Sequence, residues 1–416
     1  LAGQIIKNYG HIYIDGLTGG AGGSVFVFST SKILNYGEFI VSDFGFFSLC
    51  GLLKNSGLVE FHNFTNMGCS TQDPLGYSGF IRNEGELIID AFLENFGVIL
   101  NESTGIITVT EDGTSYTTRA FINRGLIVNQ GGFDDNGLAL GNPPPFENWG
   151  TFLNEGNASF HNGFRNYYTF NNLGGFTCGG SVAQADAINY GIFHNTGTVN
   201  TGSARDFIHQ GQSLENNGMM ERIVHKKGII VGTGLFEEGL ENGAVIAPGL
   251  PDQIGTMSID GPFDNHRKKL NIQLHANGTN DLLIVNGPAS ISGYLGISVV
   301  NPDGLLPGTI FTFLDATSID LNYPFFELIN LPDSGNWNLI YDSPNPGEIS
   351  IEYVSAFGAL NDRGSMEAKP DYSVFPNPAS DYFVLDLSQF GAFPFRLELM
   401  NTQGQVVWAN DVMGGE

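Results

Sequence analysis

The feature that most constrains this chain is a short motif, Asn, any residue, then Gly, which begins at least thirteen times before residue 220. A run of apolar residues usually follows it, as in HIYI (11–14), EFIV (38–41) and LVEF (58–61). Asn and Gly tolerate positive φ, so each unit predicts a tight corner followed by a short strand. The predicted corner residues are Asn8, Gly10, Asn35, Gly37, Asn55, Gly57, Asn83, Gly85, Asn95, Gly97, Asn123, Gly125, Asn148, Gly150, Asn189 and Gly191.

The spacing of the corners favours an all-β fold built as a parallel, right-handed β-helix, or solenoid. Steps of 11–12 residues, as from Asn55 to Asn66, mix with steps of 20–28 residues, as from Asn8 to Asn35. We expect coils of about 20–28 residues with two or three short strands each, stacked about 4.8 Å apart. Stacked Asn side chains would pass amide hydrogen bonds from coil to coil, and Ile, Val, Phe and Leu would fill the interior.

An antiparallel sandwich with Asn-Gly hairpins is the alternative. Two-residue hairpins place Asn and Gly side by side between longer strands. Here a residue usually separates Asn from Gly, and the strands are short, so the solenoid is favoured. Gly or Asn interrupts nearly every window of ten residues, which argues against an α/β fold.

The net charge of the chain limits which binding partners are expected. The formal net charge is −26, with only 17 Lys and Arg among 416 residues. Such a surface repels phosphate backbones, so nucleic acid is not expected as a partner. No stretch of about 20 apolar residues predicts a membrane span. The chain begins at Leu1, and we expect a product from which an export signal has been removed.

The sequence pattern changes after residue 245. Residues 1–245 carry the corner repeat, and residues 246–355 contain an APG…GT turn followed by an Asp and a Gly-punctuated ladder. This segment resembles the C-terminal part of autotransporter-like and adhesin-like β-solenoids, which implies a continuation and cap of the solenoid. The matching residues are Ala247, Pro248, Gly249, Gly255, Thr256, Asp281, Gly287, Gly293, Gly308 and Thr309.

The tail forms a separate segment. Residues 356–371 lose the strand pattern and predict a linker. Residues 372–416 contain the opening Pro376-Asn377-Pro378, the strand YFVLDL and the segment LELMNTQGQVV, with Gly404 in its turn. They are similar to the C-terminal sorting domain of Bacteroidota type IX secretion cargo. The resemblance implies a small antiparallel β-sandwich, here without the family's last strand, and export by the type IX machinery to the cell surface or beyond.

The three cysteines leave two interpretations open. Cys50 and Cys69 lie about one coil apart, so they could face each other on adjacent coils and form a disulfide, which an extracellular location permits. Alternatively, both are buried small apolar residues. Cys178 would remain unpaired in either case.

Catalytic and cofactor motifs are sparse. Asp134-Asp135 is the nearest pair of carboxylates and is interpreted as a solvated turn. The histidines show no metal-ligand spacing; His62, His161 and His194 are interpreted as residues stacked at corners. We therefore predict no catalytic residue, no metal site and no cofactor.

These observations favour a secreted, non-enzymatic structural or adhesive protein of the cell surface, as a filament or stalk subunit. It could polymerise with copies of itself, end to end or by strand complementation. The alternative is a protein that binds or degrades polysaccharides, with Trp149, Tyr167 and Tyr168 stacking on surface glycans.

Overall fold

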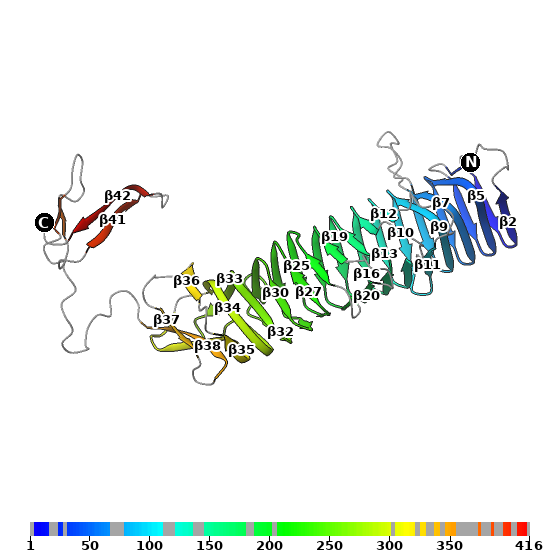
Figure 1. Cartoon of the computed structure of the whole chain (residues 1–416). Helices are drawn as coiled ribbons and strands as arrows, with labels where there is room; N and C mark the ends of the chain where they lie inside the picture. Colours follow the sequence, from blue (N-terminus) through cyan, green and yellow to red (C-terminus); the bar gives the residue numbers. More distant parts are fainter. Residues whose placement is uncertain are drawn as a thin grey trace. The chain divides into compact units, whose positions relative to one another are not determined.

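The structure is a computed structural model, and it divides the chain into two compact units, Leu1–Phe357 and Gly358–Glu416 (Figure 1). It describes residues 4–15, 24–27, 31–66, 79–110, 121–135, 145–179, 187–201, 206–300, 304–320, 325–329, 337–341, 346–354, 373–375, 384–386, 394–400 and 406–413. Within these ranges the regular elements are strands, and no helix is present. The predicted all-β class is confirmed.

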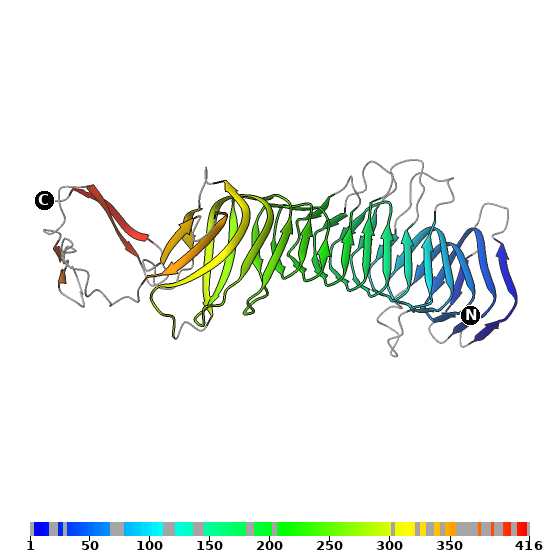
Figure 2. The same cartoon turned by 90° about the horizontal axis from the view of Figure 1, so that it is seen from below.

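The first unit is a parallel β-helix with three faces, as the corner repeat predicts. Most of its coils contribute one short strand to each face, and each strand pairs in parallel with its equivalent in the next coil. Val98–Asn101, for example, aligns residue for residue with Leu126–Asn129. Figure 2 shows these strands stacked side by side along the unit.

The strands of the three faces are as follows. The first face consists of β1 (Ile5–Asn8), β4 (Lys32–Asn35), β6 (Leu52–Asn55), β8 (Phe80–Asn83), β10 (Val98–Asn101), β13 (Leu126–Asn129), β16 (Thr151–Asn154), β19 (Thr169–Asn172), β22 (Ile192–Asn195), β25 (Ser213–Asn216), β28 (Ile229–Gly232) and β31 (Val245–Pro248). The second consists of β2 (His11–Asp15), β11 (Ile106–Val109), β14 (Gly132–Asp135), β17 (Asn157–Phe160), β20 (Gly175–Cys178), β23 (Thr198–Asn200), β26 (Met219–Met220), β29 (Leu235–Glu237) and β32 (Thr256–Asp260). The third consists of β3 (Ser24–Val27), β12 (Phe121–Asn123), β15 (Phe146–Asn148), β18 (Phe164–Asn166), β21 (Ala187–Asn189), β24 (Phe207–His209), β27 (Ile223–His225) and β30 (Leu240–Asn242).

Longer strands bend around the corners at both ends of the unit. Near the start, β5 (Glu38–Leu49), β7 (Leu58–Asn66) and β9 (Glu86–Asn95) each cover the second and third faces. Near the other end, β33 (Phe263–His275) covers the third and first faces, and β34 (Leu282–Val300) follows all three. The basic segment at Arg267-Lys268-Lys269 therefore lies within a strand, at a register shift where Arg267 has a φ of 57°.

Coil length varies more than the sequence predicts. Equivalent Asn residues are 28 positions apart between Asn101 and Asn129, but 18 apart between Asn154 and Asn172. His225 and Asn242 are only 17 apart. The corners from the first face to the second and from the third face to the first mostly span two residues, whereas the connection from the second face to the third ranges from two residues to more than ten.

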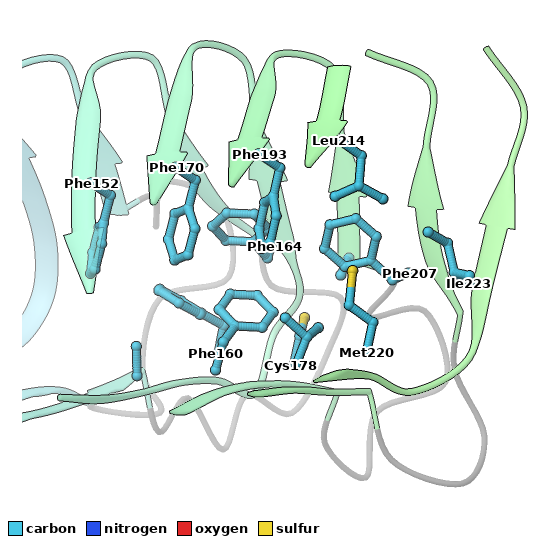
Figure 3. Close-up of a cluster of buried hydrophobic side chains, with 14 of the residues drawn as sticks. Phe152, Phe160, Phe164, Phe170, Cys178, Phe193, Phe207, Leu214, Met220 and Ile223 are labelled. Atoms are coloured by element: carbon cyan, nitrogen blue, oxygen red, sulfur yellow. The ribbon is translucent and has the colours of Figure 1, made fainter. Parts of the chain in front are cut away.

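Buried side chains from the strands of all three faces fill the interior, and phenylalanine dominates its middle part (Figure 3). On the first face Phe152, Phe170 and Phe193 align in register, and their rings stack with centroids 5.0 and 5.1 Å apart. Small residues make room for these rings: Ala158 stands in register between Phe133 and Phe176. The result is a continuous aromatic core whose rings contact within and between coils.

The strand pattern changes after β34. Strand β35 (Thr309–Asp320) pairs in parallel with β34, and β36 (Phe325–Ile329) pairs with the last part of β34. Strands β38 (Glu348–Tyr353) and β37 (Trp337–Tyr341) then add in antiparallel order to β35. Because they reverse the strand direction, β38 and β37 close the parallel stack along β35.

In its described residues, the second unit contains two separate pairs of antiparallel strands. Strand β39 (Ser373–Phe375) pairs with β40 (Val384–Asp386), and β41 (Pro394–Met400) pairs with β42 (Val406–Met413). The predicted motif residues Pro376, Asn377, Pro378 and Gly404 lie outside the described residues.

Candidate functional site

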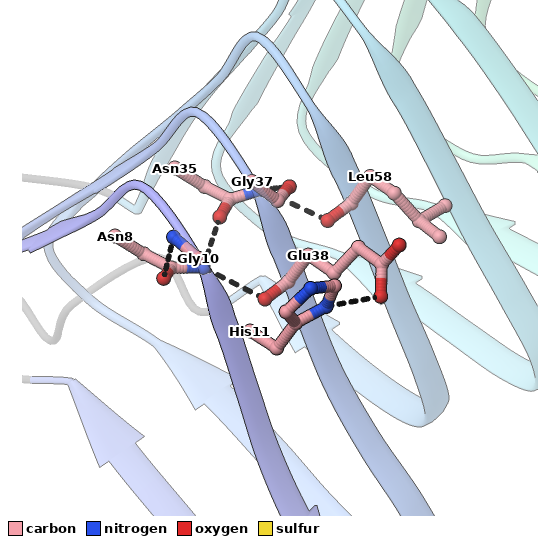
Figure 4. A network of polar contacts seen from close by, with 7 residues as sticks. All are labelled: Asn8, Gly10, His11, Asn35, Gly37, Glu38 and Leu58. Atoms are coloured by element: carbon pink, nitrogen blue, oxygen red, sulfur yellow. Dashed lines mark hydrogen bonds and ion pairs between the residues drawn. The ribbon is translucent and has the colours of Figure 1, made fainter.

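The corners of the β-helix carry its most regular polar structure, a chain of side-chain amides here called the first ladder. At each step the Nδ2 of one Asn donates to the Oδ1 of the Asn one coil further on, over 2.7–2.8 Å. Figure 4 shows its start at Asn8 and Asn35. The first ladder consists of Asn8, Asn35, Asn55, Asn83, Asn101, Asn129, Asn154, Asn172, Asn195 and Asn216.

The amides of the first ladder also bind the backbone. Asn35 Nδ2 donates to the Leu58 carbonyl over 2.8 Å, and Asn55 Oδ1 accepts the Gly57 N–H over 3.1 Å. Each amide therefore joins its own corner to the following strand in the next coil. Because the Asn side chains are almost completely buried, this use of both polar atoms removes the cost of taking them out of water.

The corner glycines serve a different purpose from the one predicted. The corner glycines do not have positive φ; the positive-φ glycines lie elsewhere in the described chain. A Cβ added to Gly37 would lie 2.1 Å from the Gly10 carbonyl oxygen, and one added to Gly150 would lie 2.1 Å from that of Gly125. At most corners glycine fits because the backbones of stacked corners approach too closely for a side chain, whereas in one coil Tyr168 occupies the equivalent position.

A second ladder follows the corner between the third and first faces. It repeats the same geometry, with Nδ2 to Oδ1 distances of 2.7–2.8 Å from Asn95 to Asn189. One corner in each ladder, Asn101 in the first and Asn166 in the second, lacks Gly at the third position, so the motif search missed both. Asn129, also missed, does fit the motif, with Gly131. The second ladder consists of Asn95, Asn123, Asn148, Asn166, Asn189, His209, His225, Asn242 and Asn265.

Two buried histidines replace Asn in the second ladder. Asn189 Nδ2 lies 2.9 Å from His209 Nδ1, and His225 Nδ1 lies 2.8 Å from Asn242 Oδ1. Their rings stack with centroids 5.3 Å apart. Burial lowers the pKa of His209 to about 3, with the His225 ring contributing, and lowers that of His225 to about 4. Both imidazoles are therefore neutral near pH 7.

The histidines predicted at corners are elsewhere. His161 contacts Asp134 over 3.3 Å and His194 contacts Glu215 over 2.9 Å, and both are partly exposed on outer faces. The side chain of His62 lies outside the described part of β7. The prediction of a stacked corner position is wrong for His194, whose side chain points outward from strand β22, whereas His161 lies in the turn directly after β17.

Aromatic side chains stack along the outside of the second ladder. The rings of Trp149 and Tyr167 lie 3.9 Å apart and those of Tyr167 and Tyr190 lie 5.0 Å apart, all nearly parallel. The Arg124 guanidinium lies 5.9 Å from the centres of both the Phe96 and Trp149 rings. Both faces of Tyr167 are thus covered by neighbouring rings, so it cannot stack on a sugar without displacing one. Tyr168, 60% exposed, takes the corner position of Gly and remains accessible.

Acidic residues lie on the second face. Asp134-Asp135 was interpreted as a solvated turn, but it belongs to strand β14, and Asp135 is buried. Because side chains alternate along this strand, one of the two carboxylates points inward, which a turn would not cause.

Sequence reasoning missed a second pair of carboxylates, Glu60 and Asp90, which form a hydrogen bond between adjacent coils. Burial, and then the charge of Asp90, raises the pKa of Glu60. Among the described residues no group of three or more His, Cys, Asp or Glu is placed to hold a metal ion.

The cysteines are only partly described. Cys50 is disulfide-bonded, whereas the Cys178 thiol is outside any disulfide and is buried in the core. Cys69 lies outside the described residues, so its pairing with Cys50 stays a prediction.

Comparison with families and curated sequences finds no relative of this chain. In the described part of the chain, no helix is long and apolar enough to cross a bilayer. Neither the models of known protein families nor the curated protein sequences contain a match to this chain.

Proposed function

We propose that the protein is a secreted, non-enzymatic structural or adhesive protein of the cell surface, used as a subunit of an extracellular filament or stalk. The observation that carries the proposal is the first ladder, which runs without interruption from Asn8 to Asn216. At about 4.8 Å for each coil, it extends over roughly 43 Å of the stack.

The two ladders add side-chain hydrogen bonds that make the β-helix more rigid. Three parallel sheets already join each coil to the next through the backbone, and each ladder adds side-chain bonds in the same direction. Bonds between Asn side chains within the buried stack hold successive corners in one register. A stack held at both its walls and its corners resists bending and slipping, which suits mechanical work.

We propose that end-to-end assembly uses the edge of β1 and β2 that faces away from β4 and β5. Within the described residues, β1 pairs only with β4, and β2 only with β5. The carbonyls of Gln4 and Asn8 accept hydrogen bonds from the next coil over 2.8 Å, so the alternate residues Ile5 and Lys7 direct their backbone groups to the opposite edge. An unpaired parallel edge of this kind can accept a strand from another molecule.

The assembly proposal is tested by electron microscopy and sedimentation velocity over a range of protein concentrations. We expect filaments or larger species that increase with concentration. Lys7→Pro removes an N–H from the free edge and should abolish them, whereas Lys7→Ala should retain them. A sedimentation profile that stays monomeric at all concentrations would contradict assembly through this edge.

Export is a separate part of the proposal. It rests on the resemblance of residues 372–416 to type IX sorting domains and is tested by fusing this segment to a reporter in a bacterium that has that secretion system. Reporter outside the cell, lost when the secretion system is disabled, supports export. Reporter that stays inside shows that the segment does not sort.

Binding of polysaccharides is the second candidate function. Exposed Tyr168 and a depression on the first face favour it. A reducing-sugar assay on a panel of polysaccharides separates binding from degradation, and we expect no release of reducing ends.

A further inference from the structure

The first face has a depression near its last coils, where strands β28, β31, β33 and β34 lie side by side. Its volume is 260 Å³, just below the usual range of about 300–1,000 Å³ for pockets that hold drug-sized ligands. A site of this size suits one ring better than a chain. The lining residues used below are Ile229, Val231, Ala247, Asp252, Asn271 and Ser298.

The floor of the depression results from small residues in one row. Val231 aligns with Ala247 in the next coil, and Asn271 aligns with Gly296 in the coils after that. A Cβ at Gly296 would lie 2.3 Å from Asn271 Oδ1, so glycine at this position gives the Asn271 side chain room to lie against β34. Ile229, Val231 and Ala247 give the floor an apolar surface.

One wall is a loop that several hydrogen bonds hold in place. Gln273 Nε2 donates to the Leu250 carbonyl over 2.7 Å, and the backbones of Gly232 and Gly249 exchange two bonds of 2.6 and 2.8 Å. Beneath them the buried Asp281 carboxylate accepts the N–H groups of Gly255 and Gln273 over 2.9 and 2.8 Å. The site is therefore formed before any ligand arrives, which reduces the entropy lost on binding.

Asn271 has an unused acceptor in this depression. Its Oδ1 is buried, and no described residue donates a hydrogen bond to it. A buried acceptor without a donor destabilises the folded chain. This Oδ1 has almost no exposed surface, so a ligand hydroxyl reaches it when the Asn271 side chain turns toward the depression, and Ser298 Oγ and the Asp252 carboxylate, both exposed at the rim, offer further partners.

We propose that this depression binds one ring of a neutral sugar, with the apolar face of the ring on Val231 and Ala247 and a hydroxyl donating to Asn271 Oδ1. The Asp252 carboxylate and the net charge of −26 disfavour uronic acids and other anionic sugars. The proposal rests on the second candidate function, glycan binding, and supplies its site.

The test uses the full chain on an array of neutral and acidic glycans, followed by calorimetry with methyl glycosides of glucose, galactose, mannose and N-acetylglucosamine. Ala247→Phe fills the depression, and Asn271→Leu removes the amide at similar volume. Thr151→Phe, which adds the same bulk to the first face several coils away, is the matched control. Circular dichroism verifies the fold of each variant.

We expect weak binding of at least one neutral glycoside, at least tenfold weaker in both Ala247→Phe and Asn271→Leu and unchanged in Thr151→Phe. Binding that survives both pocket variants would place the sugar elsewhere, leaving glycan binding itself intact. Binding of acidic glycans alone would overturn the site, and failure of every glycan to bind would overturn the site and the glycan-binding function together, while the filament proposal would be unaffected.

Discussion

Asn189 Nδ2 donates to His209 Nδ1 over 2.9 Å, and this bond fixes which nitrogen of a buried histidine carries the proton. Asn189 Oδ1 already accepts the Nδ2 of Asn166 over 2.7 Å, so Asn189 can present only its Nδ2 to the next coil. His209 Nδ1 must therefore accept. His225 Nδ1, in contrast, faces the Oδ1 of Asn242, and its Nε2 faces the Lys227 carbonyl over 3.1 Å. The direction of the second ladder thus places the proton of His209 on Nε2, whereas a neutral His225 can donate to only one of its two acceptors.

The first prediction is that acid weakens the coils around these histidines. The folded-state pKa values, about 3 for His209 and about 4 for His225, lie below the ordinary value of 6.5. Below pH 6.5 the two histidines therefore bind protons in the unfolded chain but not in the folded chain. Stability is fully present above pH 6.5 and is lost as pH falls from 6.5 toward 3, by up to about 1.4 kcal/mol for each histidine and pH unit.

Carboxylates also respond to acid, so the prediction needs a difference measurement. The double variant His209→Asn, His225→Asn restores an all-amide second ladder and removes both titrating groups. Urea midpoints measured from pH 7.5 to 4 should fall more steeply for the original chain than for the double variant. Equal slopes would show that the histidines are protonated in the folded state.

The second prediction concerns one amide of the first ladder. Asn154 Nδ2 donates to Asn172 Oδ1 and to the Gly175 carbonyl, both over 2.8 Å. In Asn154→Asp an oxygen would face these two acceptors, and we expect a loss of about 3 kcal/mol or more at pH 7, because the buried carboxylate repels them.

Acid should partly rescue Asn154→Asp, because a protonated carboxyl can donate to Asn172. The exposed Asn157, on the next strand of the same coil, provides the control: Asn157→Asp should change the urea midpoint little. If Asn154→Asp were as mild as the control, the ladder would contribute no stability.

The third prediction tests why the corners contain glycine, either because stacked backbones approach closely or because the backbone φ disfavours other residues. A Cβ at Gly150 would lie 2.1 Å from the Gly125 carbonyl oxygen, whereas one at Gly10, in the first coil, has nothing within 4 Å. Gly150→Ala should therefore cost about 3 kcal/mol by overpacking, and Gly10→Ala should cost nothing. Thermal melts of the two variants test this, and equal losses would mean that both corners need glycine for its φ.

The sequence predicts this fold well because nearly every coil needs the same residue types at its corners. Asn is needed for the amide chain and Gly for the contact between stacked backbones, so both recur at visible spacings. The histidines were missed because His209 and His225 resemble neighbouring surface histidines in sequence; only the register with Asn189 and Asn242 places them inside. The depression on the first face was missed because Ala247 and Asn271 come from different coils.

The last prediction tests the aromatic core at Phe164. Its ring lies among those of Phe160, Phe170 and Phe176, with centroids 4.9–5.2 Å away, and the side chain is fully buried. Phe164→Ala should cost about 3–5 kcal/mol, since the stacked coils cannot close the cavity without losing register, and Phe164→Leu should cost much less. Hydrogen exchange should locate the loss in strands β15, β18 and β21, because each coil contacts chiefly its neighbours. Uniform loss of protection along the whole β-helix would instead mean that its coils unfold as one cooperative unit.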